Sequence, residues 1–224
     1  MNEIHFIKNI HFDEGLKCNS FGKGEEPFMR QGDLDGACAV YSLMMMLVLH
    51  QKVNKNDLKN RESSPGYSAN KRLQDQFLHG LIGLYRGGYD FQTLRGDLHS
   101  CFKSKATATV YTTDKNIEGH VSKDELNKLI MDTIDKGNPV EVGYSVKGPR
   151  CGHAMVAIGY QLHKNNRLIL FCLDPSYDLP RTALWNSVLV IYLDMDKHKK
   201  YTADYIPNDY WMDNVDIDEI LVID

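Results

Sequence analysis

The sequence predicts an α+β fold in which a helical lobe over residues 14–103 precedes a mostly antiparallel β-sheet lobe over residues 104–224. Apolar residues recur with helical spacing in the first part, whereas β-branched and aromatic runs separated by turns fill the second. A chain of 224 residues suffices for one core or two lobes that share an interface, but is short for two independent domains. We therefore expect a single domain spanning residues 1–224.

The first fifty residues lead into a central helix. Residues 1–13 begin with alternating apolar positions, which predict a short strand or an extended arm. Residues 14–36 are rich in glycine and charge and predict a loop, with Asp35 as the N-cap of the next helix. Residues 37–50 are apolar on nearly every face, so they predict a buried helix.

Three further helices are expected. Residues 51–69 are polar and predict a surface loop or a ragged helix end. Residues 73–85 carry an apolar stripe at three- and four-residue steps, and residues 91–102 carry a second one. Ser122 is followed three residues later by Glu125, the arrangement of a capping box, and this helix ends at Gly137.

The β-sheet is predicted from the second half of the chain. Residues 106–113 are rich in threonine, valine and tyrosine, which favour strands. Later runs of the same texture predict strands over residues 140–146, 153–162, 167–173, 184–193 and 217–223.

Composition excludes several classes of partner. The formal net charge is −4 and no run of five or six basic residues occurs, so we expect no nucleic acid. The longest apolar stretch, residues 37–49, is too short to span a bilayer, so we expect no membrane span. The start of the chain has no Sec-type signal pattern, which predicts a cytoplasmic protein or export by a route without a signal peptide. Five cysteines without framework spacing indicate reduced thiols.

Cys38 is the candidate nucleophile among these cysteines. A free thiol with a pKa of about 8.5 is mostly protonated at neutral pH, and a helix N-terminus together with an imidazolium lowers that pKa. Cys38 stands in the first turn of the predicted buried helix, where unsatisfied N–H groups favour negative charge. The alternative is that Cys38 is a small hydrophobic residue at the start of that helix.

His153 and Asp174 are the candidate base and the group that orients it. His153 begins one predicted strand and Asp174 ends the next, so in an antiparallel pair both lie at the same edge of the sheet. A nucleophilic cysteine requires such a histidine held by a third polar group. The alternatives are a hydrogen-bonded strand-end histidine and an ordinary Asp-Pro turn.

The ordered motifs resemble those of the papain-like cysteine peptidase superfamily. They are Gln31 before Cys38-Ala, the run His153-Ala-Met-Val-Ala-Ile-Gly-Tyr, and Leu173-Asp-Pro-Ser-Tyr. The pattern is most similar to bacterial staphopain-like and bacteriocin-leader-processing branches, and it covers about two thirds of the chain. The resemblance implies a papain-like fold with the site in the cleft between the lobes. It also implies that Cys38 is the nucleophile, His153 the general base and acid, Asp174 the orienter, and Gln31 with the Cys38 N–H the oxyanion hole.

Three features depart from the plant papain pattern. The run Cys-Gly-Ser-Cys-Trp is absent, Asp174 stands where those enzymes use asparagine, and Gln31 precedes Cys38 by seven residues, one more than usual. The spacing leaves open that Gln31 is an ordinary exposed loop residue.

Metal sites are the other chemistry considered. Cys151, His153, Cys172 and Asp174 alternate on two adjacent predicted strands and could converge on zinc, but their spacing matches no common zinc motif. The acidic C-terminal part lacks the ordered spacing of a calcium-binding EF-hand. We therefore expect no metal and no cofactor.

The expected function is that of a thiol-dependent hydrolase, foremost a cysteine protease. It would cleave a protein or peptide substrate through an acyl-enzyme formed on its own Cys38. The same constellation serves protein deamidases and transglutaminases, and a catalytically inactive papain-like binding module is the alternative from another class. A bacterial effector or toxin is a hypothesis about the kind of enzyme, not drawn from any residue. The sequence leaves the oligomeric state open.

Overall fold

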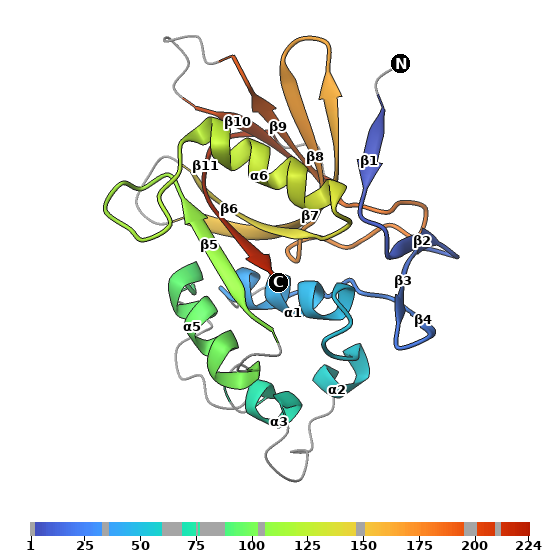
Figure 1. The fold of residues 1–224 in the computed structure, drawn as a ribbon. Helices are drawn as coiled ribbons and strands as arrows, with labels where there is room; N and C mark the ends of the chain where they lie inside the picture. The colour runs from blue at the N-terminus through green and yellow to red at the C-terminus, as the bar shows by residue number, and fades with distance from the viewer. Residues whose placement is uncertain are drawn as a thin grey trace.

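The computed structural model describes residues 3–32, 36–59, 69–74, 76, 88–102, 106–146, 151–194, 201–208 and 212–224. It combines helices with a mostly antiparallel β-sheet, so the predicted α+β class is confirmed (Figure 1).

Six antiparallel strands close into a barrel, which the sequence did not predict. Their order is β7-β6-β11-β10-β9-β8, and β8 pairs with β7 to complete the ring. β5 (Ala108–Thr112) adds to β11, and β1 (Ile4–Phe6) adds to β7. The barrel strands are β6 (Val140–Val146), β7 (Cys151–His163), β8 (Arg167–Leu173), β9 (Ser187–Tyr192), β10 (Ala203–Pro207) and β11 (Asp213–Ile223).

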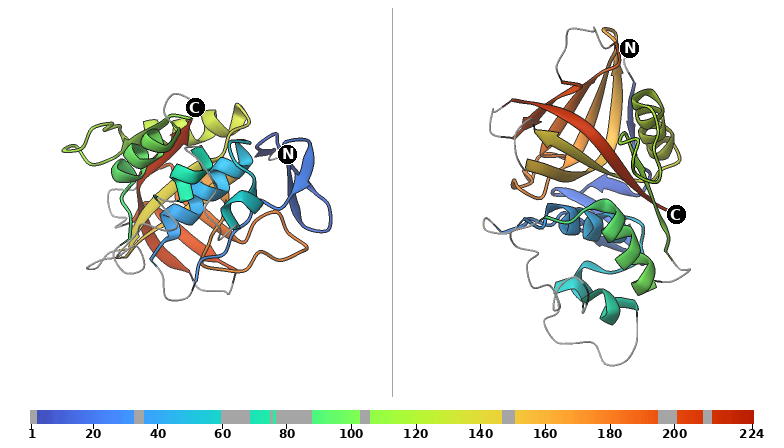
Figure 2. Two further views of the ribbon diagram at one scale, coloured as in Figure 1. Left: turned by 90° about the horizontal axis from the view of Figure 1, so that it is seen from below. Right: turned by 90° about the vertical axis from the view of Figure 1, so that its left-hand side faces the viewer.

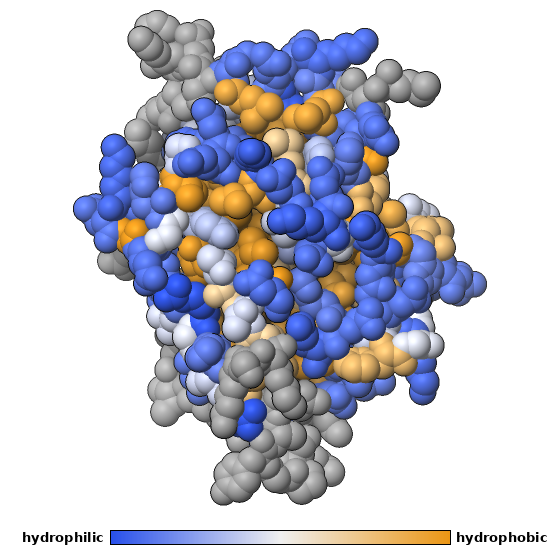
Figure 3. Space-filling view, viewed as in Figure 1, coloured by the Kyte–Doolittle hydropathy of each residue, from blue (hydrophilic) through white to orange (hydrophobic). Residues whose placement is uncertain are grey.

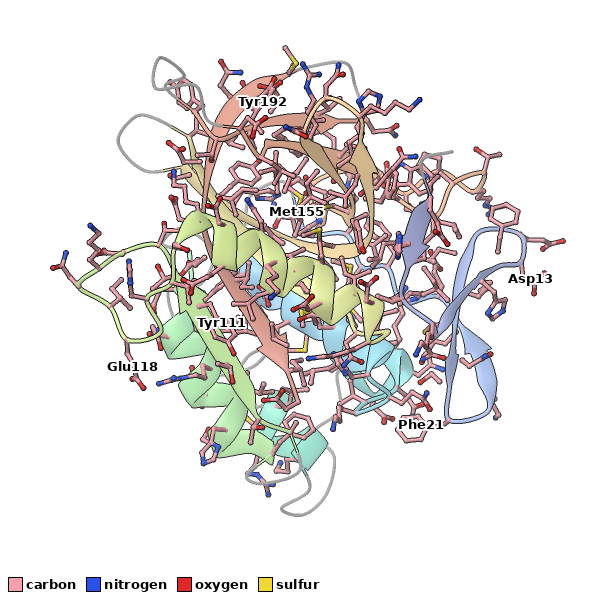
Figure 4. The ribbon with its side chains drawn as sticks, turned by 45° about the horizontal axis from the view of Figure 1, so that its top comes forward. Asp13, Phe21, Tyr111, Glu118, Met155 and Tyr192 are labelled. Atoms are coloured by element: carbon pink, nitrogen blue, oxygen red, sulfur yellow. The ribbon has the colours of Figure 1, made fainter. Side chains whose placement is uncertain are left out.

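Alternating side chains fill the barrel. Along β9 the buried residues alternate with half-buried ones, as the two-residue period of a strand requires. Leu189 of β9 stands in register with Leu170 of β8, and neither is exposed. Met155, labelled in Figure 4, is fully buried, and its sulfur accepts a hydrogen bond from Ser187 Oγ at 3.7 Å. The barrel is therefore a packed core.

Helix α1 (Cys38–Leu49) packs against β6 and β7, and ten of its residues are buried. Ser42 Oγ in this helix donates a hydrogen bond to the carbonyl of Ala154 on β7 at 3.2 Å. The helix is central, as its apolar sequence predicts. Its N-cap is Ala37, without a side-chain cap, so the expectation of an Asp35 cap is wrong; Asp35 itself lies outside the described residues.

The other helices divide into two groups. α2 (Lys55–Lys59), α3 (Ala69–Gln74) and α5 (Phe91–Phe102) gather with α1 on one side of the barrel (Figure 2). α6 (Lys123–Asp135) lies across the outside of the barrel (Figure 1), and its predicted capping box is confirmed.

The N-terminal segment differs from the prediction. Residues 14–36 were expected to form a loop, but they contain β3 (Leu16–Ser20) and β4 (Lys23–Glu25), which form a three-stranded sheet with β2 (Ile10–Phe12). The strands have only three to five residues and are flanked by glycines, so their two-residue period hardly stands out. The predicted helix over 73–85 lies almost entirely outside the described residues.

The face seen in Figure 3 is largely hydrophilic, with apolar side chains in small patches between the polar ones. Within the described ranges, no helix is both long and apolar enough to cross a membrane.

Candidate active site

Cys38, His153 and Asp174 come from three elements that meet at one end of the barrel. Cys38 is the first residue of α1, His153 is near the start of β7, and Asp174 directly follows β8. Because β7 and β8 run antiparallel with Val156 opposite Leu173, the start of β7 adjoins the end of β8. The juxtaposition expected from the sequence is therefore present.

A hydrogen bond joins the imidazole to the carboxylate. The distance between Nε2 of His153 and Oδ1 of Asp174 is 2.8 Å. Asp174 is fully buried, and the His153 side chain is 17% exposed. Since Nε2 is directed at Asp174, Nδ1 is the ring nitrogen available to Cys38, and the thiol is hydrogen-bonded to the His153 side chain. The three side chains form one continuous chain of contacts.

The thiol of Cys38 is more acidic than an ordinary cysteine. Burial raises its pKa, but the hydrogen bond to His153, the charge of His153 and the backbone amides of Ala154 and Ala39 together lower the pKa below its usual value. Cys38 also begins α1, where the N–H groups of the first turn have no partner within the helix and favour an anion.

The imidazole of His153 shifts in the opposite direction. Burial lowers its pKa, but the charge of Asp174 and the hydrogen bonds to Asp174 and Cys38 raise the pKa to about 10. For the carboxyl of Asp174 burial acts in the other direction and raises the pKa. The charge of the imidazolium and the hydrogen bonds to Asp174 nevertheless hold the pKa of Asp174 below its usual value. These opposite shifts favour a thiolate–imidazolium pair beside an ionised carboxylate.

Further groups hold the carboxylate of Asp174 in place. Its Oδ1 also accepts the N–H of Ser176 at 2.8 Å, and its Oδ2 accepts the hydroxyl of Tyr205. The backbone at Asp174 is clamped by Asn186, which accepts the Asp174 N–H at 2.7 Å and donates to its carbonyl at 2.8 Å. Asp174 is therefore fixed by contacts from its own turn, from the segment before β9 and from β10.

The sequence matches the model of the Peptidase_C39 like family over residues 25–198, which is more than half of the chain. The chain belongs to the Peptidase_C39 like family. This membership confirms the resemblance to the papain-like cysteine peptidase superfamily and supports a cysteine-peptidase type of function. A search of the curated proteins finds no match.

Gln31 reaches the same turn of this Peptidase_C39 like chain. Its backbone N–H donates to the carbonyl of Pro175 at 2.9 Å, and its side-chain Nε2 donates to Ser176 Oγ at 2.9 Å. Its Oε1 is buried and has no hydrogen-bond partner within the described part of the chain. Gln31 is therefore a half-buried residue fastened beside Asp174, which argues against an ordinary exposed loop glutamine.

The zinc alternative gains no support in this Peptidase_C39 like chain. Cys172 stands opposite Ala157, four residues along β7 from His153, and burial raises the pKa of its thiol. The side chain of Cys151 lies outside the described set. Among the described side chains, no group of three or more histidine, cysteine or acidic residues could hold a metal ion.

Three residues near Cys38, His153 and Asp174 were not predicted from the sequence. The ring of Tyr144, in register with His153 on the neighbouring strand, meets the imidazole edge to face with centroids 5.5 Å apart. Tyr205 comes from β10, a short strand without a clear apolar pattern, and Asn186 from the turn before β9. Tyr144 and Asn186 lie within predicted strands, but the strand patterns did not indicate that either would contact His153 or Asp174, and Tyr205 lies on a strand that was not predicted.

Proposed function

We propose that this protein is a cysteine peptidase that cleaves a peptide bond through an acyl-enzyme on Cys38. The observation that carries the proposal is the hydrogen-bonded chain from Cys38 through His153 to Asp174, in which the pKa of the thiol is lowered and that of the imidazole is raised. A thiolate beside an imidazolium is the reactive form of a catalytic cysteine.

Acylation begins when the thiolate sulfur of Cys38 attacks the carbonyl carbon, and the electron pair of the C=O bond moves to the oxygen. His153 then gives its proton to the amide nitrogen, the C–N bond breaks and the amine leaves, so that a thioester remains on Cys38. In the second half His153 takes a proton from water, the resulting hydroxide attacks the thioester and the C–S bond breaks. Asp174 keeps the ring oriented throughout.

The oxyanion is assigned to two donors. Cys38 is the first residue of α1, so its backbone N–H has no acceptor within the helix. The side-chain amide of Gln31 has two hydrogens, one of which is donated to Ser176 Oγ. The second hydrogen can stabilise the developing charge, and the contact with Ser176 holds the amide in position.

A pocket beside α1 suggests an apolar side chain in the substrate. Its volume is about 370 Å³, within the ordinary range for ligand sites. Val40 and Met44 line it from α1 and Leu58 from α2, together with the segment that leads to Gln31. Tyr41, which also lines the pocket, follows Cys38 by three residues, and side chains at this spacing are neighbours on a helix surface.

The test compares the wild type with Cys38→Ala and His153→Ala. Iodoacetamide should alkylate Cys38 much faster than the other cysteines, and His153→Ala should abolish that preference. Mass spectrometry of a candidate lysate should show cut peptides with the wild type but not with Cys38→Ala. Conversion of a side-chain amide to an acid without chain cleavage would identify a deamidase, and attachment of an amine to a side-chain amide with loss of ammonia would identify a transglutaminase. Equally slow labelling of every cysteine would refute the proposal and leave a binding module.

A further inference from the structure

A fully buried carboxyl group without a partner lies near the candidate nucleophile. Glu141 on β6 has no exposed surface, and neither of its carboxyl oxygens has a hydrogen-bond partner among the described residues. Buried charges are normally paired, and an unpaired carboxyl in the interior takes the neutral form instead. The proposed triad does not use Glu141.

Its location follows from the two-residue period of the strand. Glu141 shares a face of β6 with Gly143, while Val142 and Tyr144 point to the other face. A Cβ at Gly143 would lie 3.0 Å from Cγ of Glu219 and 3.3 Å from the ring of Phe91, so this face is the one covered by α5. Helix α1, which begins at Cys38, packs against the same strand and against β7.

The neighbours of Glu141 are apolar or acidic. Val156 of β7 and Leu221 of β11 stand in register with it on either side. From the elements packed here, and within the described residues, the titratable groups whose charges act on it are Cys38 of α1 and Glu219 of β11. Burial first, and then these two groups, raise the pKa of Glu141 well above its usual value.

We propose that Glu141 is a buried acid beside Cys38 that remains protonated while the thiolate forms, and whose ionisation would oppose that thiolate. The inference rests on the proposed function, because it takes Cys38 as the nucleophile. The two groups would both be anionic in one poorly solvated region, and like charges there repel strongly. The proton on Glu141 therefore permits a thiolate at Cys38.

The coupling has to be reciprocal. If ionised Glu141 raises the pKa of Cys38, then a thiolate at Cys38 raises the pKa of Glu141 by the same amount. Converting the thiolate to a neutral thioether removes that repulsion. The carboxyl of Glu141 should then lose its proton at a lower pH.

Infrared spectroscopy measures this directly through the carbonyl band of a protonated carboxyl group. At neutral pH the wild type should show a stronger band than Glu141→Gln, in which only the part-protonated Glu219, with a pKa of about 7, contributes. The band of Glu118→Gln, at an exposed position on the edge of the molecule, should match that of the wild type (Figure 4). After iodoacetamide alkylation of Cys38, the titration midpoint of the band should fall by roughly one pH unit, the effect of one neighbouring charge. An unchanged midpoint, or an unchanged band in Glu141→Gln, would overturn the proposal.

Two further measurements protect the test. On the acidic side of its pH profile, the alkylation rate of Cys38 should depend on pH in the same way in the wild type and in Glu141→Gln. A profile shifted to lower pH in the variant would mean that Glu141 is already charged in the wild type, and would refute the proposal. If Glu141→Gln does not fold, the test uses Glu219→Gln instead. Burial raises the pKa of Glu219 to about 7, and its removal leaves Glu141 as the carboxyl in this region whose band is titrated before and after alkylation of Cys38. Failure of the proposed function appears separately, as slow alkylation of Cys38, and Cys38→Ser then supplies the neutral comparison for Glu141.

Discussion

At the residue scale, the charge of Asp174 controls the imidazole. Without that charge the burial of His153 dominates, and burial lowers the pKa of the ring. Asp174→Asn should therefore remove the imidazolium at neutral pH and raise the pKa of Cys38. We expect the alkylation rate of Cys38 at pH 6 to fall by about tenfold or more, as each unit of pKa corresponds to a factor of ten.

The matched control is Asp178→Asn. Asp178 is 80% exposed and pairs with Arg30 at 3.2 Å, so its loss should leave the rate nearly unchanged. Mass spectrometry over time measures the alkylation rate of Cys38 in each variant. Equal rates in the wild type and Asp174→Asn would contradict the assigned role of Asp174.

Tyr205 should contribute mainly to stability. Its hydroxyl donates to the buried carboxylate of Asp174, and hydrogen bonds to charged groups are worth about 1.5–3 kcal/mol. Tyr205→Phe should lower the free energy of unfolding by that amount in urea titrations. Tyr192→Phe, which removes a hydroxyl bonded to half-buried Asp204, should cost less than about 1 kcal/mol. The reverse order would show that Tyr205 does not stabilise the carboxylate.

The residues of the proposed triad were predictable because their chemistry is tied to their place in predicted elements. Cys38 opens an apolar helix, and His153 and Asp174 flank the predicted strands. The groups that hold Asp174 were not predictable. Tyr205 reaches the carboxylate from β10, a strand that the sequence did not predict. Asn186 bonds to the backbone of Asp174 across the end of the β8–β9 pair, and the pattern of the strands does not give the register of that pair.

At the element scale, the pocket between α1 and α2 should govern the choice of substrate. Leu58→Trp fills the pocket from its half-buried side. We expect kcat/KM to fall by about tenfold for peptides with a large apolar side chain near the cleaved bond, since one lost apolar subsite is worth 1–3 kcal/mol. The alkylation rate of Cys38 should not change, because the substitution leaves the triad intact.

Leu129→Trp on α6 is the control for this prediction, since Leu129 is also half-buried but lies on the helix outside the barrel. Kinetics on a peptide library would measure both variants. Equal losses in the two would mean that the effect comes from general destabilisation, and no loss in Leu58→Trp would exclude the pocket as a subsite.

Strong local patterns predicted elements well. β6 and β8 have the predicted bounds, and α6 begins after its capping box. Short polar strands gave weaker patterns, so β3, β4 and β10 were missed. An element's type follows from its own residues, but a strand of three to five residues carries too few positions to define a period.

At the scale of the whole molecule, the alternation of side chains identifies strands but does not say which strands pair. Closure into a barrel depends on strand tilt and stagger, which involve all six strands together. The pairing of β7 with β8 follows from a short hairpin and was expected, whereas the pairing of β6 with β11 joins segments about seventy residues apart and was not.

The pH dependence of stability should carry the signature of His153. Its folded pKa of about 10 lies above the ordinary value, so its contribution is fully present below about pH 6.5 and is lost as the pH rises through 10. The free energy of unfolding should therefore be greater for the wild type than for His153→Gln at pH 6, by on the order of 3–5 kcal/mol. Urea titrations across this range should show the gap closing towards pH 10, and a constant gap would contradict it.

His153 and Asp174, the proposed base and its orienting acid, lie 21 residues apart on the β7–β8 hairpin. The sulfur of Cys38 belongs to a helix more than a hundred residues earlier in the chain. Hairpin formation is local and fast, whereas docking a distant helix must overcome the entropy of closing a long loop. Assembly of the site is thus expected to be sequential, with the dyad formed first and the thiol activated only on docking. A nascent or partly unfolded chain would then carry an ordinary, weakly reactive cysteine, which protects its surroundings from premature attack.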